Sequence, residues 1–132
     1  MRWYLDASVA LHAILPFGDR RARPWLLDRH AAADQLLSST LLELEIARAL
    51  RRDRLDLQRA RLVLDRVSLV SLEDGVLHVA ANIEPHGKTL DAIHLATCSM
   101  LGYGVTLATH DAAMILACGN LGIATFDPLA PA

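Results

Sequence analysis

The sequence predicts an α/β protein, a three-layer α/β/α sandwich with a central, mainly parallel sheet. Short apolar runs alternate with longer stretches whose apolar side chains recur at helical spacing. The runs lie at residues 2–5, 35–39, 68–72, 104–109 and 122–126. Strands connected through helices pair in parallel and carry helices on both faces. The length, 132 residues, fits a single domain spanning the whole chain.

The first two helices are marked by proline and glycine. Residues 7–15 carry apolar side chains at helical spacing until Pro16 and Gly18 end the pattern. Pro24 fits the first turn of a helix that runs to residue 33, because its missing N–H would have no partner there. The strand at residues 35–39 follows.

The middle of the chain predicts two amphipathic helices, at residues 41–53 and 57–67. Thr40 is expected to cap the first of them, and Glu43 is placed to complete a capping box. The strand at residues 68–72 then completes this half of the sheet.

The last third predicts three helices. A short helix at residues 76–83 is expected to end at the turn formed by Pro85, His86 and Gly87. Thr89 is expected to cap a longer helix at residues 90–101, which Gly102 and Gly104 terminate. After the strand at residues 104–109, the final helix begins near Asp111.

Composition excludes several classes of protein. Apolar residues make up 53% and charged residues 21%, so a full core is available and disorder is excluded. A net charge of -2 excludes binding to nucleic acid or membranes by bulk charge. Cys98 and Cys118 lack the spacing of a metal site or disulfide scaffold, so we expect both to be reduced core residues. Without a signal peptide or an apolar run long enough to span a bilayer, we expect a cytoplasmic protein with no membrane partner.

Four acids stand where an open parallel sheet binds ligands, beyond the carboxyl ends of its strands. Asp6 closes the first strand, and Asp111 follows the fourth. Glu45 and Asp91 lie near the starts of their helices among apolar neighbours. Two carboxylates ~4 Å apart repel by roughly 4 kcal/mol at an effective dielectric constant of 20, so such a cluster requires a cation. Carboxylate oxygens without His or Cys favour Mg²⁺ or Mn²⁺, which predicts a hydrolytic phosphodiester centre.

Four motifs, in this order, make the chain resemble the PIN-domain ribonucleases, most closely the VapC-type toxins of toxin-antitoxin pairs. They are YLDASVAL, with Asp6 and Ser8; SSTLLELEIARAL, whose E-x-x-R-A-L begins at Glu45; LDAIHLA, with Asp91; and THDAAM, with Thr109 and Asp111. The resemblance runs from residue 4 to residue 126.

The resemblance implies a metal-dependent endoribonuclease. Asp6, Glu45, Asp91 and Asp111 would hold one or two Mg²⁺ or Mn²⁺ ions, and Ser8 and Thr109 would orient the acids or a water. The family's chemistry is in-line attack of water on phosphorus, with a 3′-hydroxyl as leaving group. A cognate antitoxin would cover the cleft and an apolar groove along residues 41–67, which also suits a homodimer.

Two residues near the motifs have open roles. Glu43 and Glu45 are about 200° apart around a helix, so only one can face the cleft. The motif favours Glu45. His110 departs from the family pattern and receives no catalytic role.

Most basic residues are Arg, concentrated between Arg48 and Arg66. They form either a solvated helical face or a surface whose guanidinium groups bind RNA phosphates or acids of a partner. Arg48, Arg51 and Arg52 are the candidates for such contacts, and Arg48 alternatively pairs with the acidic cluster.

Two rival functions remain at this point. A receiver-like signalling module also gathers acids and Mg²⁺ at strand ends, but it needs an acidic pair after the first strand, and only Asp6 stands there. The second rival is a pseudonuclease that only binds a partner. The presence of all four acids argues against it, because such a protein would not need them.

Overall fold

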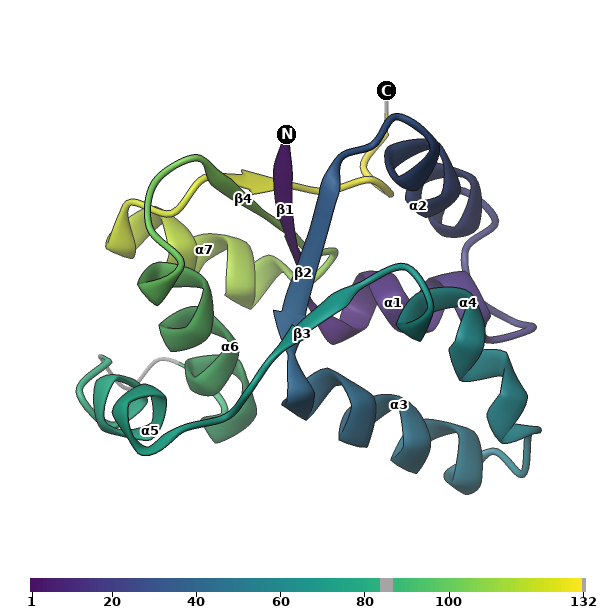
Figure 1. The fold of residues 1–132 in the computed structure, drawn as a ribbon, viewed down its shortest axis with the longest axis horizontal. Coiled ribbons are helices and arrows are strands. Elements are labelled where there is room, and N and C mark those ends of the chain that lie inside the picture. The colour runs from purple at the N-terminus through teal and green to yellow at the C-terminus, as the bar shows by residue number, and fades with distance from the viewer. Residues whose placement is uncertain (84–86, 132) are drawn as a thin grey trace.

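The computed structural model describes residues 1–83 and 87–131 and contains a five-stranded sheet in the order β3-β2-β1-β4-β5. The strands are β1 (Arg2–Leu5), β2 (Gln35–Ser39), β3 (Ser68–Val70), β4 (Val105–Ala108) and β5 (Thr125–Phe126). Every pairing is parallel. The predicted α/β architecture is confirmed; β1 and β2 have the expected bounds, and β3, β4 and β5 are shorter than expected (Figure 1).

Helices cover both faces of the sheet (Figure 1). The helices are α1 (Ala7–Ile14), α2 (Ala22–Ala31), α3 (Thr40–Arg52), the 3-10 turn η1 (Leu57–Ala60), α4 (Arg61–Leu64), α5 (Asp74–Ala81), α6 (Thr89–Met100) and α7 (Ala112–Leu121). The elements from α1 to α4 pack on one face around Trp3 and Leu5, whereas α6 and α7 pack on the other around Tyr4. α5 lies against α6.

β1 lies at the centre of the sheet because its side chains are apolar on both faces. Trp3, Tyr4 and Leu5 are all buried, and they alternate between the two helical layers. In an all-parallel sheet, the residues that follow β1, β4 and β5 emerge at one edge. That edge is therefore where Asp6 and Asp111 meet.

Both predicted helix caps on α3 and α6 are wrong by one residue. Ser39 caps α3, because its Oγ accepts a hydrogen bond from the N–H of Leu41, and Thr40 is already helical. Glu43 is therefore one position too late for a capping box. Lys88 precedes α6 without a capping side chain, so Thr89 is the first helical residue.

Two predicted helices also have different bounds. The helix expected at residues 57–67 divides into η1 and α4, because Asp56 caps a tight turn by accepting from the N–H of Gln58. α5 begins earlier than expected, at Asp74, and ends at Ala81. The turn expected after it includes Pro85 and His86, which lie outside the described residues.

Cys98 and Cys118 are buried free thiols, as predicted. Among the helices of residues 1–83 and 87–131, none is both long and apolar enough to cross a bilayer.

Candidate functional site

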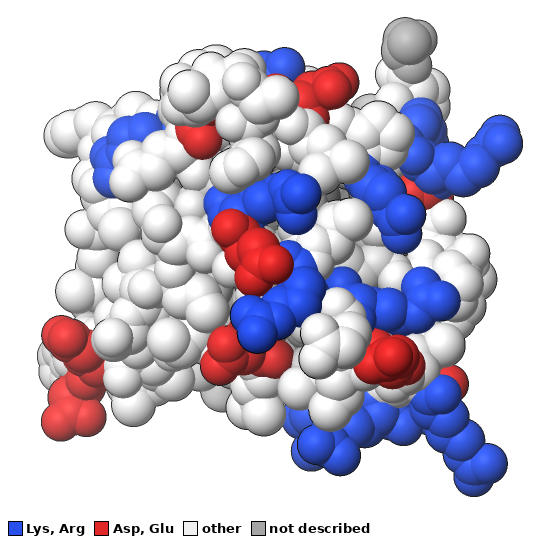
Figure 2. All heavy atoms as spheres, turned by 45° about the vertical axis from the view of Figure 1, so that its right-hand side comes forward, with Lys and Arg blue, Asp and Glu red and all other residues white. Residues whose placement is uncertain are grey.

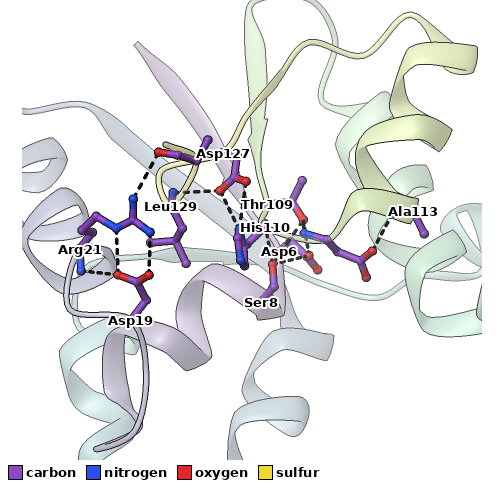
Figure 3. Close-up of polar contacts among 11 residues, drawn as sticks. Asp6, Ser8, Asp19, Arg21, Thr109, His110, Ala113, Asp127 and Leu129 are labelled. Carbon is purple, nitrogen blue, oxygen red and sulfur yellow. Dashed lines mark hydrogen bonds and ion pairs between the residues drawn. The ribbon is translucent and has the colours of Figure 1, made fainter. Parts of the chain in front are cut away.

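Asp6 is the centre of a hydrogen-bond network at the carboxyl edge of the sheet (Figure 3). The residue is only 4% exposed, and its N–H continues the ladder by donating to the carbonyl of Ala108. Its Oδ2 accepts from Ser8 Oγ at 2.9 Å and from Thr109 Oγ1 at 2.7 Å. Its Oδ1 accepts from the N–H of Ala7 at 2.8 Å and so caps α1. The carboxylate is therefore held in one orientation by residues that follow β1 and by Thr109, which follows β4.

Ser8 and Thr109 also fix the loop that follows β4. Ser8 Oγ accepts from the N–H of His110 at 2.9 Å, and Thr109 Oγ1 accepts from the N–H of Asp111 at 3.1 Å. Each hydroxyl thus donates to Asp6 and accepts from the loop after β4. Together they join the two segments that carry the predicted acids.

Asp111 caps α7 and faces the same edge. Its Oδ1 accepts from the N–H groups of Ala113 and Met114, at 2.8 and 3.3 Å. Both bonds fall on one oxygen, so a helix cap and a metal ligand are compatible roles for this side chain. A carboxylate has about four acceptor positions, and the second oxygen is available to a cation.

Asp91, in the first turn of α6, shares the electrostatic environment of these acids. The pKa of its carboxyl is raised, first by burial and then by the negative charges of Asp6 and Asp111. Electrostatic interactions with His94 and Lys88 lower it in part. Asp91 therefore lies within electrostatic reach of both Asp6 and Asp111.

Glu45 is half-buried on α3, whereas Glu43 is exposed. Glu45 Oε1 is 2.5 Å from His94 Nε2, and His94 Nδ1 is 2.7 Å from the hydroxyl of Tyr4. An ionised carboxylate has no proton to donate, so Nε2 donates to Glu45 and Nδ1 accepts from Tyr4. This contact, and not periodicity, separates Glu45 from Glu43.

Sequence reasoning overlooked His94 as a partner of the acids. It is fully buried, and it follows Asp91 by three positions on α6, a spacing that places both on one face of a helix. That spacing could have indicated, from the sequence alone, that His94 lies near the acids.

Asp127 was also overlooked. Its carboxylate lies 3.0 Å from His110 Nδ1 and accepts from the N–H of Leu129. The residue directly follows β5, so the rule that pointed to Asp6 and Asp111 points to Asp127 as well. His110 is exposed at the rim, and its ring packs edge-on against that of His12 with centroids 5.6 Å apart.

Among the described residues, the three predicted arginines form no ion pair with these acids. Arg48, Arg51 and Arg52 are exposed on α3, and Arg52 pairs with Asp53 at 3.4 Å. Within the described ranges, no ion pair joins Arg48 to the acids. The alternative of Arg48 as a salt-bridge neighbour of the cluster is therefore not supported.

The donors at the edge fit a hard divalent cation. Asp6, Asp91 and Asp111 offer oxygen atoms, and the negative charges of Asp6 and Asp111 penalise the charged form of Asp91. In the part of the chain that the structure describes, no three His, Cys, Asp or Glu side chains are packed tightly enough to enclose an ion. Mg²⁺ ordinarily keeps several waters and takes only one or two carboxylates directly, so an open arrangement of acids suits it.

An apolar pocket of about 320 Å³ adjoins Asp91, between α5, α6 and α7. Its wall includes Leu77, Ile93, Met114 and Ala117. Along residues 41–67, where an apolar groove is expected, Leu44 on α3 and Leu57 on η1 are exposed.

Comparison with known proteins shows similarity over nearly the whole chain. A model of the PIN domain matches residues 3–119. Ribonuclease VapC46 of Mycobacterium tuberculosis (strain ATCC 25618 / H37Rv) is 36% identical over 130 residues, covering 95% of this chain and 96% of the relative. Ribonuclease VapC47 of Mycobacterium tuberculosis (strain CDC 1551 / Oshkosh) is 28% identical over the same coverage.

Among solved structures, a toxin-antitoxin complex from Klebsiella pneumoniae contains a chain of the same fold. The TM-score is 0.72 at 20% identity, with 97% of this chain and 98% of that chain covered. At this level of identity, the likeness concerns the fold alone.

Proposed function

The chain belongs to the PIN domain family, and from that premise we propose that it is an endoribonuclease toxin that hydrolyses RNA phosphodiester bonds with Mg²⁺ or Mn²⁺. The observation that carries the proposal is the hydrogen-bond network in which Ser8 and Thr109 join Asp6 to the segment that carries Asp111, with Asp91 within electrostatic reach of both acids. The names of the two relatives, both ribonucleases, favour RNA as the substrate.

Each residue of the site has a distinct task in this proposal. Asp6, Asp91 and Asp111 hold the cation, and Ser8 and Thr109 keep the carboxylate of Asp6 aimed at it. When bound, the cation supplies a nucleophilic water at neutral pH and stabilises charge on the phosphoryl oxygens. Glu45, held by His94, would position the attacking water. No side chain needs to form a covalent intermediate.

We propose a cognate antitoxin as the partner of this chain. One matched structure is a toxin-antitoxin complex. The apolar pocket beside Asp91 would let an inhibitory segment reach the acids while burying its own apolar side chains. The exposed leucines of α3 and η1 offer a second apolar surface, suited to a homodimer. A ribonuclease toxin of this kind would act in the cytoplasm, where its substrate is found.

The experiment that tests the proposal is cleavage of total cellular RNA by the purified protein with Mg²⁺, with Mn²⁺ and with EDTA. We expect fragments with either ion and none with EDTA. Asp6→Asn and Asp91→Asn should abolish cleavage. Asp28→Asn, which removes an exposed acid from α2, is the matched control and should cut at the parental rate. Equal cleavage by the parent and Asp6→Asn would refute the assigned site.

A further inference from the structure

A basic hollow adjoins the acidic edge, between the end of α1 and the start of α2. It measures about 260 Å³, and its wall includes His12, Asp19, Arg20 and Arg23. Figure 2 shows that basic side chains gather on this side of the molecule, over α2, α4 and the end of α3. Neither the family motifs nor the catalytic proposal uses these residues.

The loop that lines the hollow is fixed by close backbone contacts and hydrogen bonds. Gly18 closes the loop over α1 so tightly that a Cβ at this position would lie 2.2 Å from the carbonyl oxygen of His12. The N–H of Gly18 donates to the carbonyl of Leu15, and the N–H of Asp19 donates to His12 Nδ1 at 2.9 Å. Because His12 Nδ1 accepts, the neutral ring carries its proton on Nε2, where it is a donor.

The charge of the hollow is positive because its one acid is already paired. The carboxylate of Asp19 accepts two hydrogen bonds from the guanidinium of Arg21, at 2.8 and 3.1 Å. Arg23 Nε donates to the carbonyl of Ala13, which holds the guanidinium at the wall with its terminal nitrogens unused. Among the residues that the structure describes, no acid forms an ion pair with Arg20 or Arg23. The guanidinium groups of Arg20 and Arg23 therefore line the hollow, and no described acid forms an ion pair with either of them.

A chain of side-chain contacts links the hollow to the proposed cleavage centre. The ring of His12 packs against that of His110, and the N–H of His110 donates to Ser8, which in turn donates to Asp6. Figure 3 shows the Asp19–Arg21 pair, the His110–Asp127 pair and the Asp6–Ser8 contact in succession. A strand lying with one phosphate at Asp6 would pass over His110 toward the hollow.

We propose that the basic hollow binds a backbone phosphate of the RNA strand, beside the phosphate that is cleaved. The inference rests on the proposed function, since it assumes an RNA substrate at Asp6. The acids of the site repel a polyanion, so affinity must come from cations nearby. Arginine forks match the oxygens of a phosphate, and such backbone contacts position a strand without reading its sequence.

The test measures binding separately from cleavage. In an Asp6→Asn background, a fluorescein-labelled, mixed-sequence single-stranded RNA of about 20 nucleotides is titrated by fluorescence anisotropy at several salt concentrations. Arg20→Ala and Arg23→Ala should each raise Kd about three- to ten-fold. Each should also reduce the slope of log K against log salt by about 0.7, as expected when one phosphate contact is lost.

The matched control is Arg2→Ala, which removes the same charge at the opposite edge of the sheet, where Arg2 contacts Gln35. Thermal melting verifies that each variant is folded; Arg20 is exposed on the surface and should be harmless to folding. If Arg20→Ala and Arg23→Ala behave like Arg2→Ala, the hollow binds no phosphate. If they lose affinity for the antitoxin and not for RNA, the hollow is a protein contact and the proposal is wrong. Failure of the parent to cleave any RNA would instead refute the proposed function, while the binding assay would still decide on the hollow.

Discussion

The imidazole of His94 holds the carboxylate of Glu45, with Nε2 2.5 Å from Oε1, although the two residues are 49 positions apart in the chain. The ring is fully buried, and its other nitrogen meets the hydroxyl of Tyr4 on β1. An acid of α3 is thereby fixed relative to α6, the helix that carries Asp91. This relationship gives His94 a positioning role in the proposed reaction.

Replacement of His94 by Ala should lower kcat for RNA cleavage about 10- to 100-fold, the usual effect of removing a residue that orients a ligand. KM should change little, because His94 does not contact RNA. The lost packing and hydrogen bonds should also reduce the free energy of unfolding by about 2–4 kcal/mol. Steady-state kinetics and urea denaturation measure both effects. His78→Ala, at an exposed position of α5, is the control and should be silent.

The two glutamates of α3 should behave differently. Glu45→Gln should reduce cleavage at least about 100-fold, because it removes the negative charge that we place at the site. Glu43→Gln should leave the rate unchanged within about two-fold, since this side chain is exposed. Initial rates under saturating Mg²⁺ give the comparison. Equal rates for the two variants would contradict the assignment of Glu45.

The hydroxyl of Thr109 should be required for both stability and activity. Thr109→Val keeps the shape but removes the donor to Asp6 and the acceptor for the N–H of Asp111. We expect a loss of about 1–3 kcal/mol in the free energy of unfolding, together with slower cleavage. Thr106→Val, on the strand β4 that precedes Thr109, is the matched control and should stay within about 0.5 kcal/mol of the parent.

The raised pKa of Asp91 makes the stability of the metal-free protein depend on pH. A raised pKa means that the folded state holds the proton more tightly than the unfolded chain, so ionisation of Asp91 destabilises the fold as pH rises. Asp91→Asn in EDTA should therefore raise Tm by a few degrees at pH 7. The gain should vanish below the ordinary carboxyl pKa of ~3.9, where both states are protonated.

Addition of Mg²⁺ should reverse the order of these melting temperatures. The ion stabilises the folded parent by binding to it and relieves the repulsion among the acids. The neutral amide introduced by Asp91→Asn binds the ion more weakly than the carboxylate, so the Tm of this variant should rise less. A parent whose Tm is insensitive to Mg²⁺ at neutral pH would contradict the proposed metal site.

Much of the fold follows from local patterns. The alternation of apolar runs with helical stretches predicted every strand of the described sheet, because burial on both faces requires continuous apolar runs. The positions of Asp6 and Asp111 follow from the same rule, since both come shortly after strands. Helix starts were less predictable, as Ser39 and Thr40 are both good caps, and the structure has Ser39 in that position.

The sequence by itself determined the architecture, the family resemblance and the edge at which Asp6, Asp91 and Asp111 should meet, because strand ends and helix periods are properties of neighbouring residues. The tertiary structure showed that Glu45 contacts His94 while Glu43 is exposed, and it revealed the pairing of His110 with Asp127. These contacts join elements that are distant in the chain, and their geometry depends on how two helical layers pack on one sheet. No local period encodes that packing, so the partners of the acids emerged only from the folded molecule.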